Sequence, residues 1–211
     1  MNTESKVLVA IAAVITVAVS VLLVVNGSSQ EGVSDTADPG TLVRKDSIQS
    51  NPGAEVTIVE FGDLQCPACA AAHPTLEQIK AEFKDEVNVV WRHFPLDTHA
   101  NAEAAANAAE AAHAEGKFFE YQDQLFTNQS AWSSAAAGNL ARFFVQYAEA
   151  VRLDGNAVKQ AVEDKKYQAK IDRDKEDGTA LGLNSTPSFF VNGQPVPTDG
   201  LRQAVRDALR K

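Results

Sequence analysis

Residues 56–69 read VTIVEFGDLQCPAC, and this stretch decides how the chain folds. A compact apolar run at 56–61 leads through a short connection to Cys66 and Cys69, the only two cysteines in the 211 residues. Such an apolar run is typical of a strand that is buried on both faces. Apolar residues then recur at helical spacing, at Ala72, Leu76, Ile79 and Phe83. The stretch therefore predicts a strand and a helix joined by a Cys-x-x-Cys pair, which is the arrangement that a thiol-redox site needs.

The predicted helix begins near Cys66, and this position gives the two cysteines different chemistry. Pro67 falls in the first helical turn, where its missing amide hydrogen costs nothing. The free N–H groups and partial positive charge of a helix amino terminus stabilise a thiolate and lower its pKa. Cys66 is therefore the candidate nucleophile, and Cys69, almost one turn further in, is the candidate resolving thiol. Pro74 lies inside the same helix and predicts a kink.

Three other uses of the cysteine pair remain open from the residues alone. Cys-x-x-Cys is often half of a zinc site, but a tetrahedral site needs two further ligands, and only His73 follows closely, four residues after Cys69. A purely structural disulfide would close a very small loop and would constrain the unfolded chain little. A domain could also keep the motif and only bind other proteins. The other histidines are predicted to be structural: His93, His99 and His113.

The first 25 residues differ from everything that follows them. Val7–Val25 is a run of nineteen residues without a charge, close to the ~20 that a helix needs to cross the hydrocarbon core of a membrane. Lys6 precedes this run and the next basic residue is Arg44, a bias that favours export of the following chain. Residues 1–25 are therefore predicted to be a cytoplasmic tip and a transmembrane signal anchor. A cleaved secretory signal is the alternative.

Both interpretations of the amino-terminal segment lead to the same compartment. We expect a single-pass protein of the cell membrane whose catalytic domain lies on the extracytoplasmic side, where a disulfide can persist. The formal net charge is −9, and the exported part keeps this value because Glu4 and Lys6 cancel. An acidic surface argues against nucleic acid and anionic lipid as partners. It identifies no substrate, and it agrees with the solubility that an exported domain needs.

Composition divides the rest of the chain into four segments. Residues 26–50 are rich in Gly, Ser, Asp, Thr and Pro and predict a flexible linker. Residues 51–97 hold the strand and helix described above and a second apolar strand at 87–94. Residues 98–182 are rich in Ala, Glu, Gln and Lys and predict a helical insertion. Residues 183–211 return to strand, with a hairpin and a last amphipathic helix.

The predicted fold class is therefore α/β. Residues 51–97 and 183–211 together form one mixed sheet with its covering helices, and the helical subdomain is inserted between them. Four features of this chain resemble the DsbA-type members of the thioredoxin superfamily, over about residues 52–211. They are EFGDLQCPAC at 60–69, the helix proline Pro74, RHFPL at 92–96 and TPSFFVNG at 186–193.

The resemblance implies a thioredoxin-like sheet and a particular geometry around the cysteines. Pro187 would follow a cis peptide bond and lie against the Cys66–Cys69 pair, turning the backbone of Thr186 toward an incoming chain. Glu60 would be a buried acid beside the cysteines that moves a proton during exchange.

The resemblance also implies where substrates bind and what the site requires. Pro67 and Ala68, between the cysteines, would contact the substrate together with Thr186 and Pro187. The reactive group would be the Cys66–Cys69 disulfide itself, without a cofactor or a metal.

One departure from the family pattern concerns the strength of the oxidant. Strongly oxidising relatives carry histidine between the cysteines, at the position of Ala68, and this histidine helps to hold the thiolate. The absence of that histidine here puts a strongly oxidising potential in doubt.

The resemblance implies a thiol-disulfide oxidoreductase that introduces disulfides into exported proteins. A membrane quinone-linked oxidase, DsbB-like or VKOR-like, would restore its disulfide. The alternatives are an extracytoplasmic reductase or isomerase of the same fold, and a non-catalytic chaperone or scaffold.

Overall fold

The computed structural model describes residues 39–211. The predicted transmembrane anchor at 1–25 and the first part of the predicted linker lie outside the described residues. Within 39–211, no helix is both long enough and apolar enough to cross a membrane.

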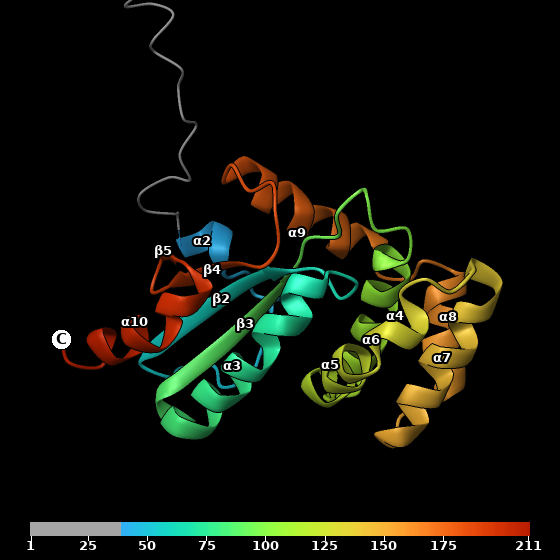
Figure 1. The fold of residues 1–211 in the computed structure, drawn as a ribbon, viewed down its shortest axis with the longest axis horizontal. Coiled ribbons are helices and arrows are strands. Elements are labelled where there is room, and N and C mark those ends of the chain that lie inside the picture. Colours follow the sequence, from blue (N-terminus) through green and yellow to red (C-terminus); the bar gives the residue numbers. More distant parts are fainter. Residues whose placement is uncertain (1–38) are drawn as a thin grey trace, which may run out of the picture. The chain divides into compact units, whose positions relative to one another are not determined.

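A five-stranded sheet forms the centre of the fold (Figure 1). Its order is β1-β3-β2-β4-β5, with β1 at Ile48–Gln49, β2 at Val56–Gly62, β3 at Val87–His93, β4 at Ser188–Val191 and β5 at Gln194–Val196. β2 is the middle strand; it runs parallel to β3 and antiparallel to β4, and both outer pairings are antiparallel. The prediction of a mixed sheet around the strand at 56–61 is confirmed.

Helices α3 (Pro67–Phe83) and α10 (Leu201–Ala208) cover one face of this sheet. Short 3-10 turns precede β3 and α10, η1 at Lys84–Glu86 and η2 at Thr198–Gly200. Alternate side chains of a strand point to the same face. The resulting core contains Val56, Ile58, Ala72, Leu76, Ile79, Val87, Val89, Phe189, Val191, Leu201 and Val205. This core fixes the axis of α3, and therefore the place where its amino terminus meets the end of β2.

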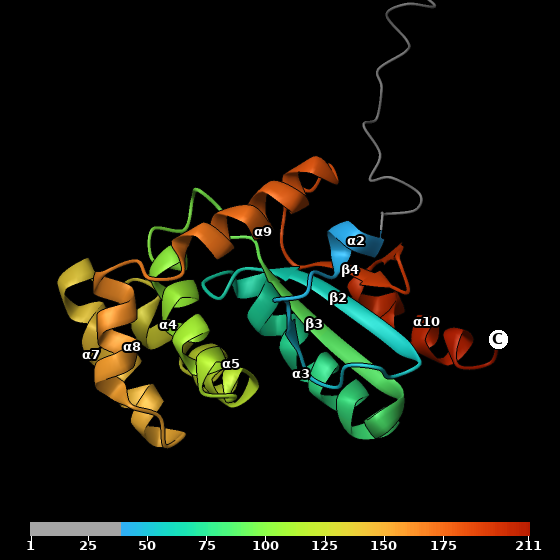
Figure 2. The ribbon, with the colours of Figure 1, turned by 180° about the vertical axis from the view of Figure 1, so that it is seen from behind.

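Helices α2 (Pro39–Leu42) and α9 (Gln168–Ala180) lie on the opposite side of the sheet from α3 (Figure 2). The apolar cluster on this face contains Leu42, Val59, Phe61, Val90, Phe94, Leu183 and Phe190. The central strand is thus covered on both faces, as its apolar run predicts.

The flexible linker predicted for residues 26–50 ends earlier than expected. α2 and β1 both belong to the folded domain, and Leu42 and Ile48 are almost fully buried. Ile48 pairs with Trp91 of β3, so β1 protects the edge of the sheet. Composition averaged over the segment 26–50 hid these two apolar anchors, because the polar residues around them dominate the average.

The helical insertion predicted for 98–182 also ends earlier than expected, because α9 returns to the sheet. A Cβ atom on Gly178 of α9 would lie 2.6 Å from Cδ2 of Phe94 and 3.1 Å from Cδ1 of Phe61. The α9 backbone therefore contacts the aromatic rings of the core directly. Its polar sequence gave no sign of this position, since its buried side chains include the carboxylates of Asp174 and Asp177.

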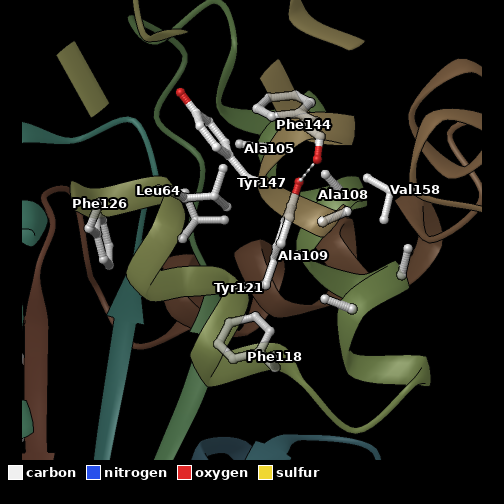
Figure 3. Close-up of a cluster of buried hydrophobic side chains, with 14 of the residues drawn as sticks. Leu64, Ala105, Ala108, Ala109, Phe118, Tyr121, Phe126, Phe144, Tyr147 and Val158 are labelled. Carbon is white, nitrogen blue, oxygen red and sulfur yellow. Dashed lines mark hydrogen bonds between the residues drawn. The ribbon is translucent and has the colours of Figure 1, made fainter. Parts of the chain in front are cut away.

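The insertion proper consists of five helices on one side of the molecule (Figure 1). They are α4 (Ala102–Ala114), α5 (Phe118–Thr127), α6 (Gln129–Trp132), α7 (Ala137–Ala150) and α8 (Gly155–Glu163). The alanines of α4 let its neighbours approach closely, and larger side chains fill the space between them (Figure 3). The hydroxyl of Tyr121 donates a hydrogen bond to the backbone oxygen of Phe144 at 3.1 Å (Figure 3). This core also includes Leu64 and both cysteines, so the insertion packs against the redox motif itself.

The hairpin predicted at Asn192-Gly193 joins β4 to β5. Both residues have positive φ angles, 46° and 84°, as a two-residue hairpin turn of this type requires. The side chain of Asn192 also accepts a hydrogen bond from the backbone N–H of Thr57 at 2.8 Å. This contact ties the turn to the central strand, and so fixes the register of β4 and of the Thr186-Pro187 segment that precedes it.

Candidate active site

The two cysteines lie where β2 delivers the chain to α3. Cys66 is the N-cap residue and Pro67 is the first residue of the helix, as the sequence predicts. Both cysteines are free thiols in this structure. Cys66 is 6% exposed and Cys69 is fully buried. Pro67 and Ala68 are exposed between them. A partner can therefore approach Cys66 across these two residues, while Cys69 stays covered.

The surroundings of Cys66 favour its thiolate, and they lower the pKa of this thiol to about 5. The largest cause is the hydrogen bond that it receives from the thiol of Cys69. Burial acts in the opposite direction. The side chain of Thr186 and the backbone N–H groups of Ala68 and Cys69 lower the pKa further, and together these contacts outweigh the burial. At neutral pH Cys66 is therefore a thiolate, the form that attacks and leaves in disulfide exchange.

The surroundings of Cys69 have the opposite effect. Burial raises the pKa of this thiol well above its usual range, and the hydrogen bond that it gives to Cys66 adds to the increase. Glu60 acts in the same direction when it is ionised. The backbone N–H of Asp63 donates a hydrogen bond to Sγ of Cys69 at 3.5 Å and acts against these effects. At neutral pH the pair is thus split into one thiolate and one thiol.

Glu60 is a buried acid of β2, in the interior close to the cysteines. Glu60 is only 3% exposed, so water solvates a charge there poorly, and burial is the first cause that raises its pKa to about 8. The negative charge of Cys66 is the second cause. Glu60 therefore carries a proton at neutral pH, within electrostatic reach of both sulfur atoms.

The Thr186-Pro187 peptide bond is cis, as the family resemblance implies. The backbone oxygen of Thr186 lies 3.5 Å from Sγ of Cys66, across 120 residues of sequence. The hydroxyl of Thr186 is buried and makes no hydrogen bond of normal geometry within residues 39–211, so it is available to donate to the Cys66 thiolate, whose pKa it lowers. The structure therefore brings together all the residues that the sequence proposes for catalysis and substrate binding.

Sequence reasoning missed the residues that hold the turn between β2 and α3. The carboxylate of Asp63 is at the centre of this turn. It accepts hydrogen bonds from the backbone N–H of Gln65 at 2.7 Å, from the backbone N–H of Leu96 at 2.9 Å and from Nδ1 of His99 at 2.7 Å. Leu96 and His99 lie 33 and 36 residues further along the chain, so no local pattern reveals them.

Amide side chains attach the same turn to the helical insertion. Gln65 accepts a hydrogen bond from the backbone N–H of Asn101 and donates one to the backbone oxygen of Ser133, both at 2.7 Å. The amide of Gln129 donates to two backbone oxygens of the turn at 2.9 and 3.0 Å. The insertion therefore positions the redox turn as well as covering it.

A buried ion-pair network links β3 to α9 and to the start of the domain. Nε of Arg92 lies 2.8 Å from a carboxylate oxygen of Asp174, and another guanidinium nitrogen pairs with Asp177. The same guanidinium donates to the backbone oxygens of Thr41 and Leu42, at 2.6 and 2.9 Å. Arg92 is thus paired on every side, which a buried charge requires.

His93 lies in a second part of this network. The indole N–H of Trp91 donates to Nδ1 of His93 at 3.1 Å, and Nε2 of His93 lies 3.0 Å from a carboxylate oxygen of Glu110. Burial alone would raise the pKa of Glu110, but the hydrogen bonds and charges of His93 and Lys170 outweigh it and hold the pKa at about 2. The structural role predicted for His93 agrees with this placement.

The described residues contain one cluster whose side chains could hold a metal ion, and it does not include the cysteines. His73, Glu77 and Asp123 bring their ligand atoms within 4.8 Å of one another. Each already has a partner, since His73 lies 2.6 Å from Asp123 and Glu77 lies 2.7 Å from Nζ of Lys80. The zinc alternative would have needed His73 as a third ligand beside the cysteines, but its ring nitrogen is directed to α5.

Comparison with known proteins agrees with this geometry. The family model described as Thioredoxin matches residues 43–209. The chain is 38% identical over 164 residues to the Na⁺/H⁺ antiporter NhaA 1 of Mycobacterium sp. (strain KMS), which covers 73% of this chain and 25% of that protein. It is 33% identical over 186 residues to the Na⁺/H⁺ antiporter NhaA 3 of Salinispora tropica, covering 86% of this chain and 27% of that protein. The chain thus spans about a quarter of the length of these curated relatives.

Solved structures share the fold over most of their length. BdbD from Bacillus subtilis superposes with a TM-score of 0.72 at 19% identity, covering 85% of this chain and 98% of BdbD. A thioredoxin-like oxidoreductase from Silicibacter pomeroyi superposes with a TM-score of 0.67 at 26% identity, covering 83% of this chain and 99% of that protein. MdbA, a thiol-disulfide oxidoreductase from Actinomyces oris, gives 0.63 at 18% identity, covering 76% and 83%. The chain belongs to the thioredoxin family and has the fold of the DsbA-like thiol-disulfide oxidoreductases.

Proposed function

We propose that this protein introduces disulfides into exported proteins by exchange through Cys66 and Cys69. The observation that carries the proposal is the unequal environment of the two thiols. The pKa of Cys66 is lowered to about 5, while burial raises that of Cys69 far above the usual range. A pair of this kind attacks or is attacked at one sulfur only, and it favours the reduced state because the Cys66 thiolate is stabilised.

The exchange proceeds in two balanced steps. A substrate thiolate attacks Sγ of Cys66, the Cys66–Cys69 bond breaks, and its electron pair goes to Sγ of Cys69. Burial keeps Glu60 protonated at neutral pH, and we assign it as the group that gives a proton to Cys69. A second substrate thiolate then attacks the substrate sulfur of the mixed disulfide, and the electron pair of the broken bond remains on Cys66 as a thiolate. The substrate has lost two electrons, and the Cys66–Cys69 pair has gained them.

The surface beside Cys66 supports the assignment of substrate contacts. Pro67 and Ala68 are exposed, and the backbone of Thr186 lies beside the reactive sulfur. An extended substrate segment can pair with the backbone of Thr186 as an added strand, while Pro187 supports it from beneath. Backbone pairing of this kind is independent of sequence, which suits an enzyme that oxidises many different exported proteins.

The cellular setting belongs to the same proposal. Val7–Val25 supports a single membrane-spanning anchor with the catalytic domain outside the cytoplasm. Each turnover leaves the cysteines reduced, so a membrane quinone-linked oxidase, DsbB-like or VKOR-like, is the proposed partner that restores the disulfide.

The test is a redox titration of the full chain against glutathione. An oxidase requires a reduction potential clearly above that of thioredoxin, about −270 mV. A potential near that of thioredoxin would instead support a reductase, and a potential near about −180 mV, typical of isomerases, would require an isomerisation assay. In parallel, the Cys66→Ala variant should lose all oxidation of a reduced model substrate. Full activity of this variant in a refolding assay would support a non-catalytic chaperone.

A further inference from the structure

The buried turn that precedes Cys66 makes a direct contact with the second sulfur. We propose that the backbone N–H of Asp63 stabilises the negative charge that develops on Cys69 during exchange, and that the Asp63 carboxylate and His99 are positioning residues that hold this N–H in place. The inference rests on the proposed oxidoreductase function.

The first observation is the hydrogen bond itself. The N–H of Asp63 donates to Sγ of Cys69 at 3.5 Å inside the protein. The backbone oxygen of the same residue accepts from the N–H of Cys66 at 3.0 Å. The peptide groups on either side of Asp63 therefore contact both halves of the redox pair, and a rotation of this residue would disturb the donor to Cys69.

The second observation is the need of Cys69 for such a donor. When a substrate thiolate attacks Cys66, the electron pair of the broken disulfide moves to Sγ of Cys69, which is fully buried. Burial is the largest effect that opposes a thiolate there. Among the main influences of residues 39–211 on the pKa of Cys69, the N–H of Asp63 is the one that lowers it. Transition-state stabilisation by a fixed backbone donor is the usual way to meet such a need.

The third observation is the set of contacts that fixes Asp63. Its buried carboxylate accepts three hydrogen bonds, one from each of the backbone N–H groups of Gln65 and Leu96 and one from Nδ1 of His99. All three neighbours are donors, so only a carboxylate with its acceptor oxygens satisfies the site. Two of the donors are backbone groups, that of Gln65 in the turn itself and that of Leu96 in the segment after β3. His99 is the one donor of the three that comes from a side chain, so it can be changed by substitution.

His99 is the better position to test because its side chain is partly exposed and lies in a loop. Asparagine can present its amide N–H close to the place of Nδ1–H, so His99→Asn is the conservative variant, and His99→Ala removes the donor. Asp63→Asn is a second test of the same contacts. Its NH₂ group is a donor and would face a site in which all three neighbours also donate. His113→Ala, in which an imidazole of α4 is lost outside this turn, is the matched control.

The experiment separates the two steps of exchange with one probe. The oxidised full chain is mixed with reduced glutathione and quenched in acid at intervals, and mass spectrometry quantifies the disulfide, the glutathione mixed disulfide and the dithiol. Cys69 is the leaving group in the first step and Cys66 is the leaving group in the second. For His99→Ala we expect formation of the mixed disulfide to be about tenfold slower, the effect of weakening one hydrogen bond to a charged atom. The second step should keep its wild-type rate.

The other variants sharpen this expectation. His99→Asn and His113→Ala should react at the wild-type rate in both steps, and Asp63→Asn should slow the first step at least as much as His99→Ala. The pKa of Cys66, measured by thiolate absorbance, should be the same in His99→Ala as in the wild type. An equal slowing of both steps, or no slowing in His99→Ala, would overturn the inference while leaving the proposed function intact. A wild-type protein that does not react with glutathione would overturn both.

Discussion

The low pKa of Cys66 predicts that the folded protein is stabilised by reduction in a strongly pH-dependent way. The perturbation is reduction of the Cys66–Cys69 disulfide, and the quantity is the difference in unfolding free energy between the reduced and oxidised forms. The folded-state pKa is about 5, against 9.0 for an unperturbed thiol. Because the folded value is the lower one, the stabilisation is complete above pH 9 and is lost as the pH falls through 5.

The magnitude follows from these two pKa values. At pH 7 the thiolate contributes about 3 kcal/mol to the stability of the reduced form, since one pKa unit corresponds to about 1.4 kcal/mol. At pH 4 the contribution is close to zero. The disulfide also restricts the unfolded oxidised chain, but this chain-entropy effect does not depend on pH. The difference between the two forms should therefore rise by about 3 kcal/mol from pH 4 to pH 7, which for a two-electron couple equals about 60 mV.

The assay is urea unfolding of both forms at a series of pH values, with dithiothreitol present for the reduced form only. Titrations of groups that do not interact with the cysteines cancel in the difference, and the Glu60→Gln background removes the titration of Glu60, which senses the charge of Cys66. A difference that stays flat between pH 4 and pH 7, or that grows toward acid pH, would show that Cys66 is not a stabilised thiolate. It would also remove the main support for the proposed oxidase.

Three further perturbations test the site and its supports. Glu60→Gln should stabilise the protein by about 3 kcal/mol at pH 7 and by almost nothing below pH 4.5. The reason is that the pKa of Glu60 is raised on folding, so the wild type loses stability as the pH rises from 4.5 to 8. Chemical unfolding at a series of pH values measures this, and a pH-independent effect would contradict it. Thr186→Val removes a group that lowers the pKa of Cys66, so thiolate absorbance should titrate about one unit higher, and an unchanged titration would refute this contribution. Gly62→Ala would place a Cβ atom 2.2 Å from the indole of Trp91, which should lower the unfolding free energy by about 1–3 kcal/mol. The control is Gly138→Ala in α7, where a Cβ atom would meet nothing within 4 Å and the unfolding free energy should not fall.

Local signals in the sequence were sufficient for the frame of the site. The strand at 56–61, the helix start at Cys66 and the hairpin at Asn192-Gly193 each depend on a few neighbouring residues whose preferences agree with the fold. The cis bond before Pro187 could be expected only from the family resemblance, since nothing local distinguishes it from an ordinary proline bond.

What the sequence could not reveal depends on contacts between distant segments. The sequence around Asp63 indicates only a short connection between a strand and a helix. Its partners Leu96 and His99 become its neighbours only after β3 has paired with β2. The burial of Leu42 and Ile48 could not be predicted from their polar segment for the same reason. These two residues are buried only because the core and the edge strand β3, which are formed by later parts of the chain, lie beside them. The structural role that the sequence predicts for His93 agrees with its hydrogen bonds, which join it to Trp91 and Glu110 inside the protein.

The ion pairs of Arg92 have a mechanical consequence for the way the domain is held. The backbone oxygens of Thr41 and Leu42 bind to this guanidinium, and Arg44 pairs with Asp177, which Arg92 also contacts. Tension applied to the chain upstream of residue 39 therefore reaches β3 and α9 first, on the face of the sheet opposite α3. The load is shared by several hydrogen bonds and ion pairs before it can reach the turn that carries the cysteines. These contacts therefore shield the redox pair from tension on the chain before residue 39.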